Sequence, residues 1–181
     1  MPLTITVPAR DFYDPVSGRF ITTKQTTIKL EYSLLSISNW ESKWHKPYLT
    51  KEPKTQEESI DFIRCMCLTK DVDPVVFAAI DEKGAKQITD YISNPMTATT
   101  FHDKEKKASR EIITSEIVYY WMTEYGIPFD PCEKWHFNKL TALIHVAALK
   151  NAPSKKMPKK EAANWRAGLN AQRRAKYHTR G

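Results

Sequence analysis

REIITSEIVYYWMTEYGIPFDPCEKWHFNKLTALIHVAALK, residues 110–150, carries two amphipathic patterns in succession. We expect the first helix to begin at Ser109 and to end at Gly126 and Pro128, which suit a helix terminus. Its apolar residues at helical spacing are Ile113, Ile117, Tyr120, Trp121 and Tyr125. This pattern predicts a helix with one face in the core.

A second helix follows the IPFDP connection. Asp130 suits an N-cap, Pro131 the first helical position and Glu133 a reciprocal capping residue. The apolar residues that continue it are Trp135, Leu140, Leu143, Ile144 and Ala147. The two helices predict an αα-hairpin whose facing stripes form the centre of the core.

Shorter helices are expected upstream, between residues 55 and 94. Thr55 and Glu58 form a capping-box pattern, and Asp73-Pro74 combines an N-cap with a proline at the first helical position. After Gly84, a further turn or two should stop at Asn94-Pro95. The apolar residues of these segments are Ile60, Ile63, Cys67, Val76, Phe77, Ile80, Ile88, Tyr91 and Ile92. We expect residues 96–107 to be a loop or an extended connection.

The first third of the chain has the two-residue period of β-strands. One run alternates at Leu3, Ile5 and Val7, and a second at Ile28, Leu30 and Tyr32. The runs predict a hairpin or small sheet with a long loop that contains Phe12, Tyr13, Phe20 and Ile21. The loop could dock on a partner, but packing on the body of the protein is the favoured expectation.

The expected fold class is α+β and mainly α, with an N-terminal hairpin or small sheet, a helical bundle and a basic C-terminal helix. The expected regions are residues 1–35 for the hairpin, 36–151 for the helical body, and 152–181 for a linker and the basic helix.

Trp40 and Trp44, in SISNWESKWHKPYL, are four residues apart and share one face of a short helix that Pro47 ends. Side chains of this size must be buried somewhere. Core packing is the favoured expectation, and an aromatic anchor for another protein is the alternative.

The C-terminal end of the chain carries most of its charge. Residues 150–181 contain ten Lys or Arg and one acid, a net charge of +9, so the other 149 residues sum to −2 of the total +7. After the linker NAPSKKMPKK, three apolar residues at helical spacing, Ala162, Trp165 and Leu169, predict a helix with a narrow stripe. The tail is therefore a solvated end or a segment that binds something acidic.

Patterns typical of enzymes are missing from the sequence. Its five glycines are scattered, so they form neither a phosphate loop nor a dinucleotide-binding motif. Three cysteines, Cys65, Cys67 and Cys132, favour buried thiols, and a zinc site that recruits Cys132, His136 and His145 would have a spacing that matches no common site. We expect no catalysis and no cofactor.

The N-terminus lacks the pattern of a signal peptide, and no apolar stretch is long enough to span a membrane. The expectation is a protein of the cytosol. Binding to nucleic acid is a possible role for the tail, since Trp165 and Tyr177 lie among its cations.

Several motifs resemble those of small tailed-bacteriophage structural-module proteins that are often regarded as tail assembly chaperones. They are YYW at 119–121, IPF at 127–129, Glu133-Lys134-Trp135-His136 and KKMPKKEAANWRAGLNAQRR with the terminal His-Thr-Arg-Gly. SISNWESKWHKPYL and NPMTATTF are also similar, so the resemblance extends from about residue 30 to the C-terminus.

The resemblance implies a non-enzymatic chaperone of the host cytoplasm that binds the tape measure protein, a long helical chain, with tail tube subunits as a further candidate client. Such a client would be bound by helix-in-groove contacts. The residues expected to bind it are Trp165, Leu169, Lys159, Lys160, Arg166, Arg173, Arg174, Trp40 and Trp44. A virion structural component at the head-tail junction and a small nucleic-acid-binding protein are the alternatives.

Overall fold

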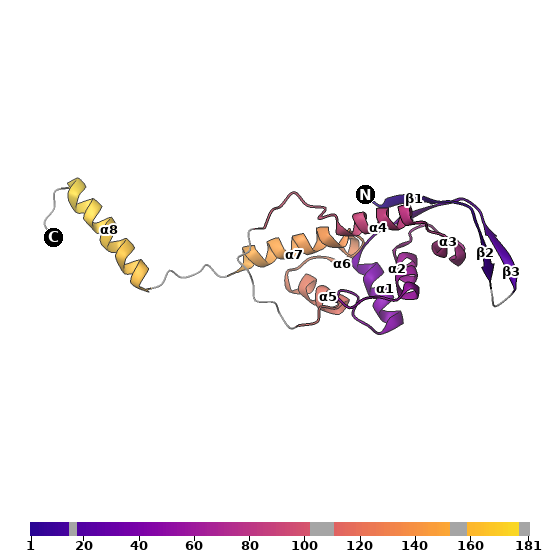
Figure 1. Cartoon of the computed structure of the whole chain (residues 1–181). Coiled ribbons are helices and arrows are strands. Elements are labelled where there is room, and N and C mark those ends of the chain that lie inside the picture. Colours follow the sequence, from indigo (N-terminus) through magenta and orange to yellow (C-terminus); the bar gives the residue numbers. More distant parts are fainter. Residues whose placement is uncertain (15–17, 102–110, 153–158, 178–181) are drawn as a thin grey trace. The chain divides into compact units, whose positions relative to one another are not determined.

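The computed structural model describes residues 1–14, 18–101, 111–152 and 159–177. Within these residues the fold is α+β and mainly α, with two small antiparallel sheets near the N-terminus and eight helices (Figure 1). The predicted fold class is thereby confirmed.

The strands are β1 (Leu3–Val7), β2 (Arg10–Asp14), β3 (Arg19–Thr23) and β4 (Thr26–Leu30). The helices are α1 (Leu34–Trp44), α2 (Gln56–Met66), α3 (Pro74–Ala78), α4 (Glu82–Ser93), α5 (Ser115–Glu124), α6 (Phe129–Cys132), α7 (Phe137–Asn151) and α8 (Lys159–Tyr177).

The four strands form one antiparallel ribbon with a single interruption. β1 pairs with β4 and β2 with β3, and both pairs keep the same register, with Ile5 opposite Ile28 and Tyr13 opposite Phe20. The interruption contains Pro8, which has no N–H to donate to a partner strand. The predicted long loop is therefore a β-hairpin that continues the first pair of strands.

The β1–β4 half of the ribbon belongs to the core. Ile5, Val7, Ile28 and Leu30 are buried, as the two-residue period predicts. Helix α4 packs against β1, and the outer edge of β4 pairs with the segment after α2, where the Leu68 N–H donates to the Lys29 carbonyl at 2.8 Å. The edge of β4 is thus paired, and β1 is packed against a helix.

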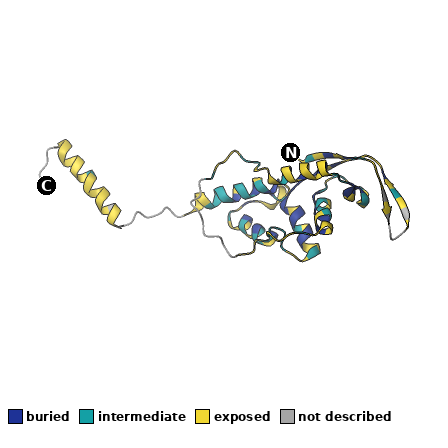
Figure 2. Ribbon diagram, in the orientation of Figure 1, coloured by how far each residue is buried: buried dark blue, intermediate teal, exposed yellow. Residues whose placement is uncertain are grey.

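Helix α1 lies at the centre of the helical part, in contact with α2 and α5. Its N-terminus is closed by a capping box in which the Ser36 N–H donates to Ser33 Oγ and the Ser33 N–H donates to Ser36 Oγ. Leu34, Ile37 and Trp40 are fully buried along its inner face (Figure 2). The predicted centre, an α5–α7 hairpin, was wrong: α5 packs on α1.

The caps predicted for α2 and α3 are confirmed. Thr55 and Glu58 form a capping box, and Asp73 accepts from the Val75 N–H before Pro74 at the first position. The core face of α2, however, is Phe62 and Met66, whereas the predicted Ile60 and Ile63 are half-buried.

The prediction for α5 was wrong in its start and its face. The helix begins at Ser115, and Ser109 lies outside the described residues. Val118 and Met122 are completely buried, whereas Tyr120 is exposed. Several apolar stripes fit this aromatic sequence at helical spacing, so periodicity alone could not select the one that meets α1.

The predicted start of the last body helix was also wrong. Residues Phe129–Cys132 form the short α6, and α7 begins only at Phe137. Glu133 does not act as a capping residue: its Oε2 accepts a hydrogen bond from the Tyr119 hydroxyl at 3.0 Å. Phe137, Leu140 and Ile144 are the buried residues of α7, while Trp135 is half-buried and Leu143 is exposed.

The chain divides into two compact units, Met1–Ala148 and Leu149–Gly181. The first contains the ribbon and the core, and the second contains α8. The finer division predicted from the sequence, with boundaries at residues 35 and 151, stays a prediction.

We predict that Leu140→Ala lowers the free energy of unfolding by about 2–5 kcal/mol, because the side chain is completely buried and its removal leaves a cavity. Leu68→Ala is the matched control. Leu68 is 56% exposed, so its loss should cost less than about 0.5 kcal/mol. Urea unfolding followed by circular dichroism measures both. Equal midpoints for the two variants would show that α7 is not part of the core.

Candidate functional site

Helix α8 carries seven of the nine residues that the sequence singled out for partner binding. Trp165 is 59% exposed and Leu169 is half-buried. The cations Lys160, Arg166, Arg173 and Arg174 are all exposed on the same helix. Lys159 is its first residue, with a side chain outside the described part of the structure. The prediction of a helix in this segment is confirmed.

The cations of α8 surround its apolar stripe unevenly. At 100° per residue, Arg166 and Arg173 lie beside the Trp165–Leu169 stripe, along the same edge of it. Lys160 and Arg174 lie across the helix from that stripe. A partner held by Trp165 and Leu169 would therefore meet two guanidinium groups along one edge, which favours a partner with acidic residues there.

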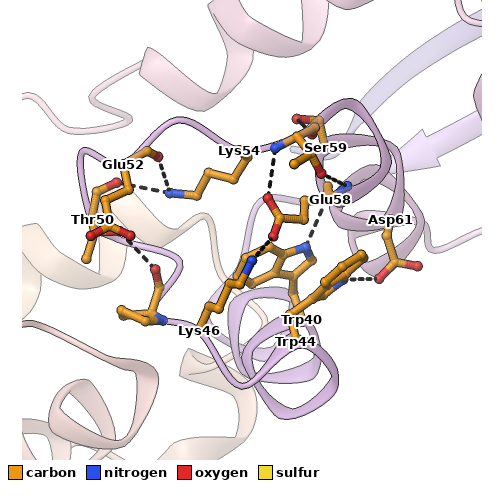
Figure 3. A network of polar contacts seen from close by, with 11 residues as sticks. Trp40, Trp44, Lys46, Thr50, Glu52, Lys54, Glu58, Ser59 and Asp61 are labelled. Carbon is orange, nitrogen blue, oxygen red and sulfur yellow. Dashed lines mark hydrogen bonds and ion pairs between the residues drawn. The ribbon is translucent and has the colours of Figure 1, made fainter.

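Trp40 is a core residue. Only 1% of its surface is exposed, and its indole N–H donates to the Glu58 carbonyl at 2.9 Å (Figure 3). The favoured expectation of core packing is confirmed, and the alternative use of Trp40 as a partner anchor was wrong. Its ring packs between Trp44 and Tyr48, with centroids 6.1 and 5.1 Å away.

Trp44 reaches the surface beside a buried acid. Its indole N–H donates to Asp61 Oδ2 at 2.9 Å. Lys43, which is on the same helix as Trp44, pairs through its Nζ with Asp61 Oδ1. Burial alone would raise the pKa of Asp61, but the hydrogen bonds from Lys43 and Trp44 outweigh it and hold the pKa below its usual range. Asp61 thus fixes the orientation of the indole.

A shallow hollow of about 420 Å³ lies at this place between α1 and α2. Trp44 and Ile60 supply its apolar wall, and two cations, Lys43 and Arg64, with two acids, Glu57 and Asp61, supply its charges. Both cations are already paired with Asp61. The hollow can therefore accept a small apolar side chain, and it lacks a surplus charge that would select an ion.

Glu58 joins the loop after α1 to the start of α2. One carboxylate oxygen pairs with Lys46 Nζ, and the other accepts from the Thr55 N–H at 2.8 Å (Figure 3). The hydrogen bond from Lys46 is the main reason that the pKa of Glu58 is lowered. The capping-box pattern in the sequence identified the Thr55 contact, whereas the Lys46 contact depends on the tertiary fold.

The tip of the β2–β3 hairpin displays two aromatic rings that were expected to pack on the body. Tyr13 is 59% exposed and Phe20 is 75% exposed, and their centroids lie 5.3 Å apart as a directly opposed cross-strand pair. The favoured expectation for these two residues was wrong. Each ring covers the other in place of the body.

Glu41 and His136 are buried polar residues whose contacts the sequence did not predict. Glu41 accepts from the Tyr48 N–H at 2.7 Å and from the Ser115 N–H at 2.8 Å, so it caps α5 from another helix. His136 Nε2 lies 3.1 Å from the Tyr91 carbonyl, and burial lowers the pKa of this imidazole. Contacts of this kind join distant segments, and no local motif announces them.

The described residues bring no three His, Cys, Asp or Glu side chains together in a group that could hold a metal ion. Cys132 is buried, and Cys65 and Cys67 are half-buried free thiols. Among the helices that the structure describes, none is both long and apolar enough to cross a membrane.

Comparison of the chain with protein-family models, curated proteins and solved structures finds no significant match.

We predict that stability falls at acid pH partly through Asp61. Its pKa is lowered in the folded state, so its contribution is complete above the unfolded value of about 3.9 and is lost as the pH falls through the lower folded value. Asp61→Asn should therefore lose less stability than the wild type between about pH 4 and pH 2. Asp90→Asn, at an exposed position on α4, is the control. Urea midpoints across this range test it, and parallel curves for Asp61→Asn and wild type would contradict it.

Proposed function

We propose that the chain is a phage tail assembly chaperone that binds the tape measure protein in the host cytoplasm, with tail tube subunits as a second client. It would act by binding, without catalysis. The single observation that carries the proposal is α8, a 19-residue helix with an exposed tryptophan and exposed cations. The motifs that resemble this group of phage proteins support the same function.

The physical chemistry of such a client fits α8. A long helical protein with apolar stripes aggregates unless the stripes are covered before assembly. The Trp165–Leu169 stripe has the width of a coiled-coil seam, and Arg166 and Arg173 lie along its edge. One helix of this kind can cover a stripe on the client and pair with acidic residues beside it.

Binding to single-stranded nucleic acid is the second candidate. Trp165 and Tyr177 are 59% and 65% exposed on α8, so both rings are accessible to bases, and cations lie near them. Stacking on aromatic rings with phosphate neutralisation is the usual mode of such binding. The two functions differ in salt dependence, since neutralised phosphates release counterions and apolar contacts do not.

For the chaperone, we predict that Leu169→Glu weakens capture of the co-expressed tape measure protein by about tenfold or more, because it places a charge in the apolar stripe. Asn170→Glu is the control, since it adds the same charge at an exposed polar position away from the stripe. The measurement is co-purification at low and high salt. If both variants capture the client as the wild type does, α8 is not the binding element.

For the second candidate, we predict that affinity for a single-stranded oligonucleotide falls steeply with salt and that Trp165→Ala lowers it by a further factor of about 5–100. Fluorescence anisotropy at several salt concentrations measures both. Tight, salt-dependent oligonucleotide binding without capture of the tape measure protein would replace the chaperone proposal. Capture that persists at high salt would support it.

A further inference from the structure

Helix α7 has an apolar face on the side opposite the core. Its buried residues, Phe137, Leu140 and Ile144, mark the inward direction. At 100° per residue, Ala142 and Val146 point away from that direction. Leu149 follows on the same outward side. The spacing of four and then three residues makes this a continuous stripe along one helix.

The outward stripe is partly exposed, most of all at its C-terminal end. Leu149 is 53% exposed and Leu143, at its edge, is 36% exposed, while Ala142 and Val146 are half-buried. Ten consecutive residues of α7, 140–149, contain no Lys, Arg, Asp or Glu. A surface helix of a globular protein normally carries charged residues on its outer face. Burial in a complex explains an apolar outer face better than exposure to water does.

Two lysines accompany the stripe. Lys139 and Lys150 are eleven residues apart, which is about three turns, so both lie along the same edge of the outward face. Lys139 Nζ lies 4.2 Å from the centroid of the Trp135 ring, which holds this cation in place. From Lys134 to Gly181 the sequence has twelve Lys or Arg and one acid, Glu161.

This charge selects the occupant. A second copy of α7 would bring the same lysines toward Lys139 and Lys150, and a basic helix of another protein would also be repelled. An acidic amphipathic helix would cover the apolar stripe and neutralise both cations. Nucleic acid fits less well, because the stripe is aliphatic and offers no ring on which a base could stack.

We propose that the outward face of α7, formed by Ala142, Leu143, Val146 and Leu149 with Lys139 and Lys150, docks an acidic amphipathic helix of another protein. The inference deepens the proposed function, since it rests on a helical client and adds a second surface for it. All six residues belong to one helix, so the face is defined without reference to α8. The client helix carries apolar residues at i, i+4 and i+7 and acids about three turns apart.

The test uses the full chain and a fluorescein-labelled synthetic helical peptide of about 20 residues, with leucines at that spacing and glutamates along one edge. A peptide with lysines in place of the glutamates is the control probe. Fluorescence anisotropy should show binding of the acidic peptide and at least about tenfold weaker binding of the lysine peptide. Equal affinity for the two peptides, or no binding of the acidic one, would overturn the inference.

Variants of the full chain locate the contact. Leu149→Glu, and separately Lys139→Glu with Lys150→Glu, should each weaken acidic-peptide binding by about tenfold or more. Their matched controls are Leu68→Glu and Lys83→Glu with Lys86→Glu, at exposed positions on other segments. These controls should bind as the wild type does. Circular dichroism and thermal melting establish that each variant is folded.

Leu169→Glu separates this inference from the proposed function. If the α7 variants lose peptide binding and Leu169→Glu retains it, the result supports the α7 surface. This holds even if α8 has no client. Binding that only Leu169→Glu loses overturns the α7 surface and leaves the role of α8 intact. Displacement of the peptide by a single-stranded oligonucleotide at the α7 face would assign that face to nucleic acid and overturn the inference.

Discussion

The segment from Leu30 to Leu35 is the constraint on which the rest of the body depends. Its backbone joins parts of the chain that are far apart in sequence: the Glu31 N–H donates to the Met66 carbonyl at 2.9 Å, and the Phe137 N–H donates to the Tyr32 carbonyl at 2.7 Å. These bonds connect the last strand of the ribbon to the end of α2 and the start of α7. Because buried backbone groups must be paired, the bonds determine where α1 begins and how α2 and α7 meet it.

Buried carboxylates extend this arrangement. Glu31 accepts from the Tyr91 hydroxyl at 2.6 Å, and Glu41, Glu58 and Asp61 each accept from two groups on neighbouring segments. A buried acid that lost its partners would cost several kcal/mol, so these contacts favour one arrangement of α1, α2, α4 and α5.

The acids of the body thus serve its own fold, and residues 1–133 carry a net charge of −4 against +11 for residues 134–181. That division supports the proposed role in binding, in which apolar stripes bordered by Lys or Arg receive acidic helices.

Most element types could be predicted from the sequence, whereas the faces that they bury could not. The alternation at Ile5, Val7, Ile28 and Leu30 predicted a half-buried pair of strands, and Thr55 and Asp73 marked helix starts, because both signals act within a few residues. In α5, Ile117, Val118, Tyr120, Trp121 and Met122 offer competing apolar stripes, and contact with α1 selected Val118 and Met122. The candidate site follows the same rule. Spacing and charge alone predicted helix α8 and marked Trp165. The burial of Trp40 and the exposure of Tyr13 and Phe20, in contrast, depend on which residues pack against each ring.

The sequence by itself determined the mainly helical α+β class, the alternating strands and the caps of α2 and α3. It also determined the separation of a basic tail from a near-neutral body. These properties depend on local backbone preferences and on composition, which every segment carries with it. Only the tertiary structure decided that Glu41 caps α5, that His136 meets the Tyr91 carbonyl and that α7 keeps an apolar outer face. The first two outcomes require residues between about 45 and 75 positions apart to meet, and a contact of that range follows from how whole elements pack together.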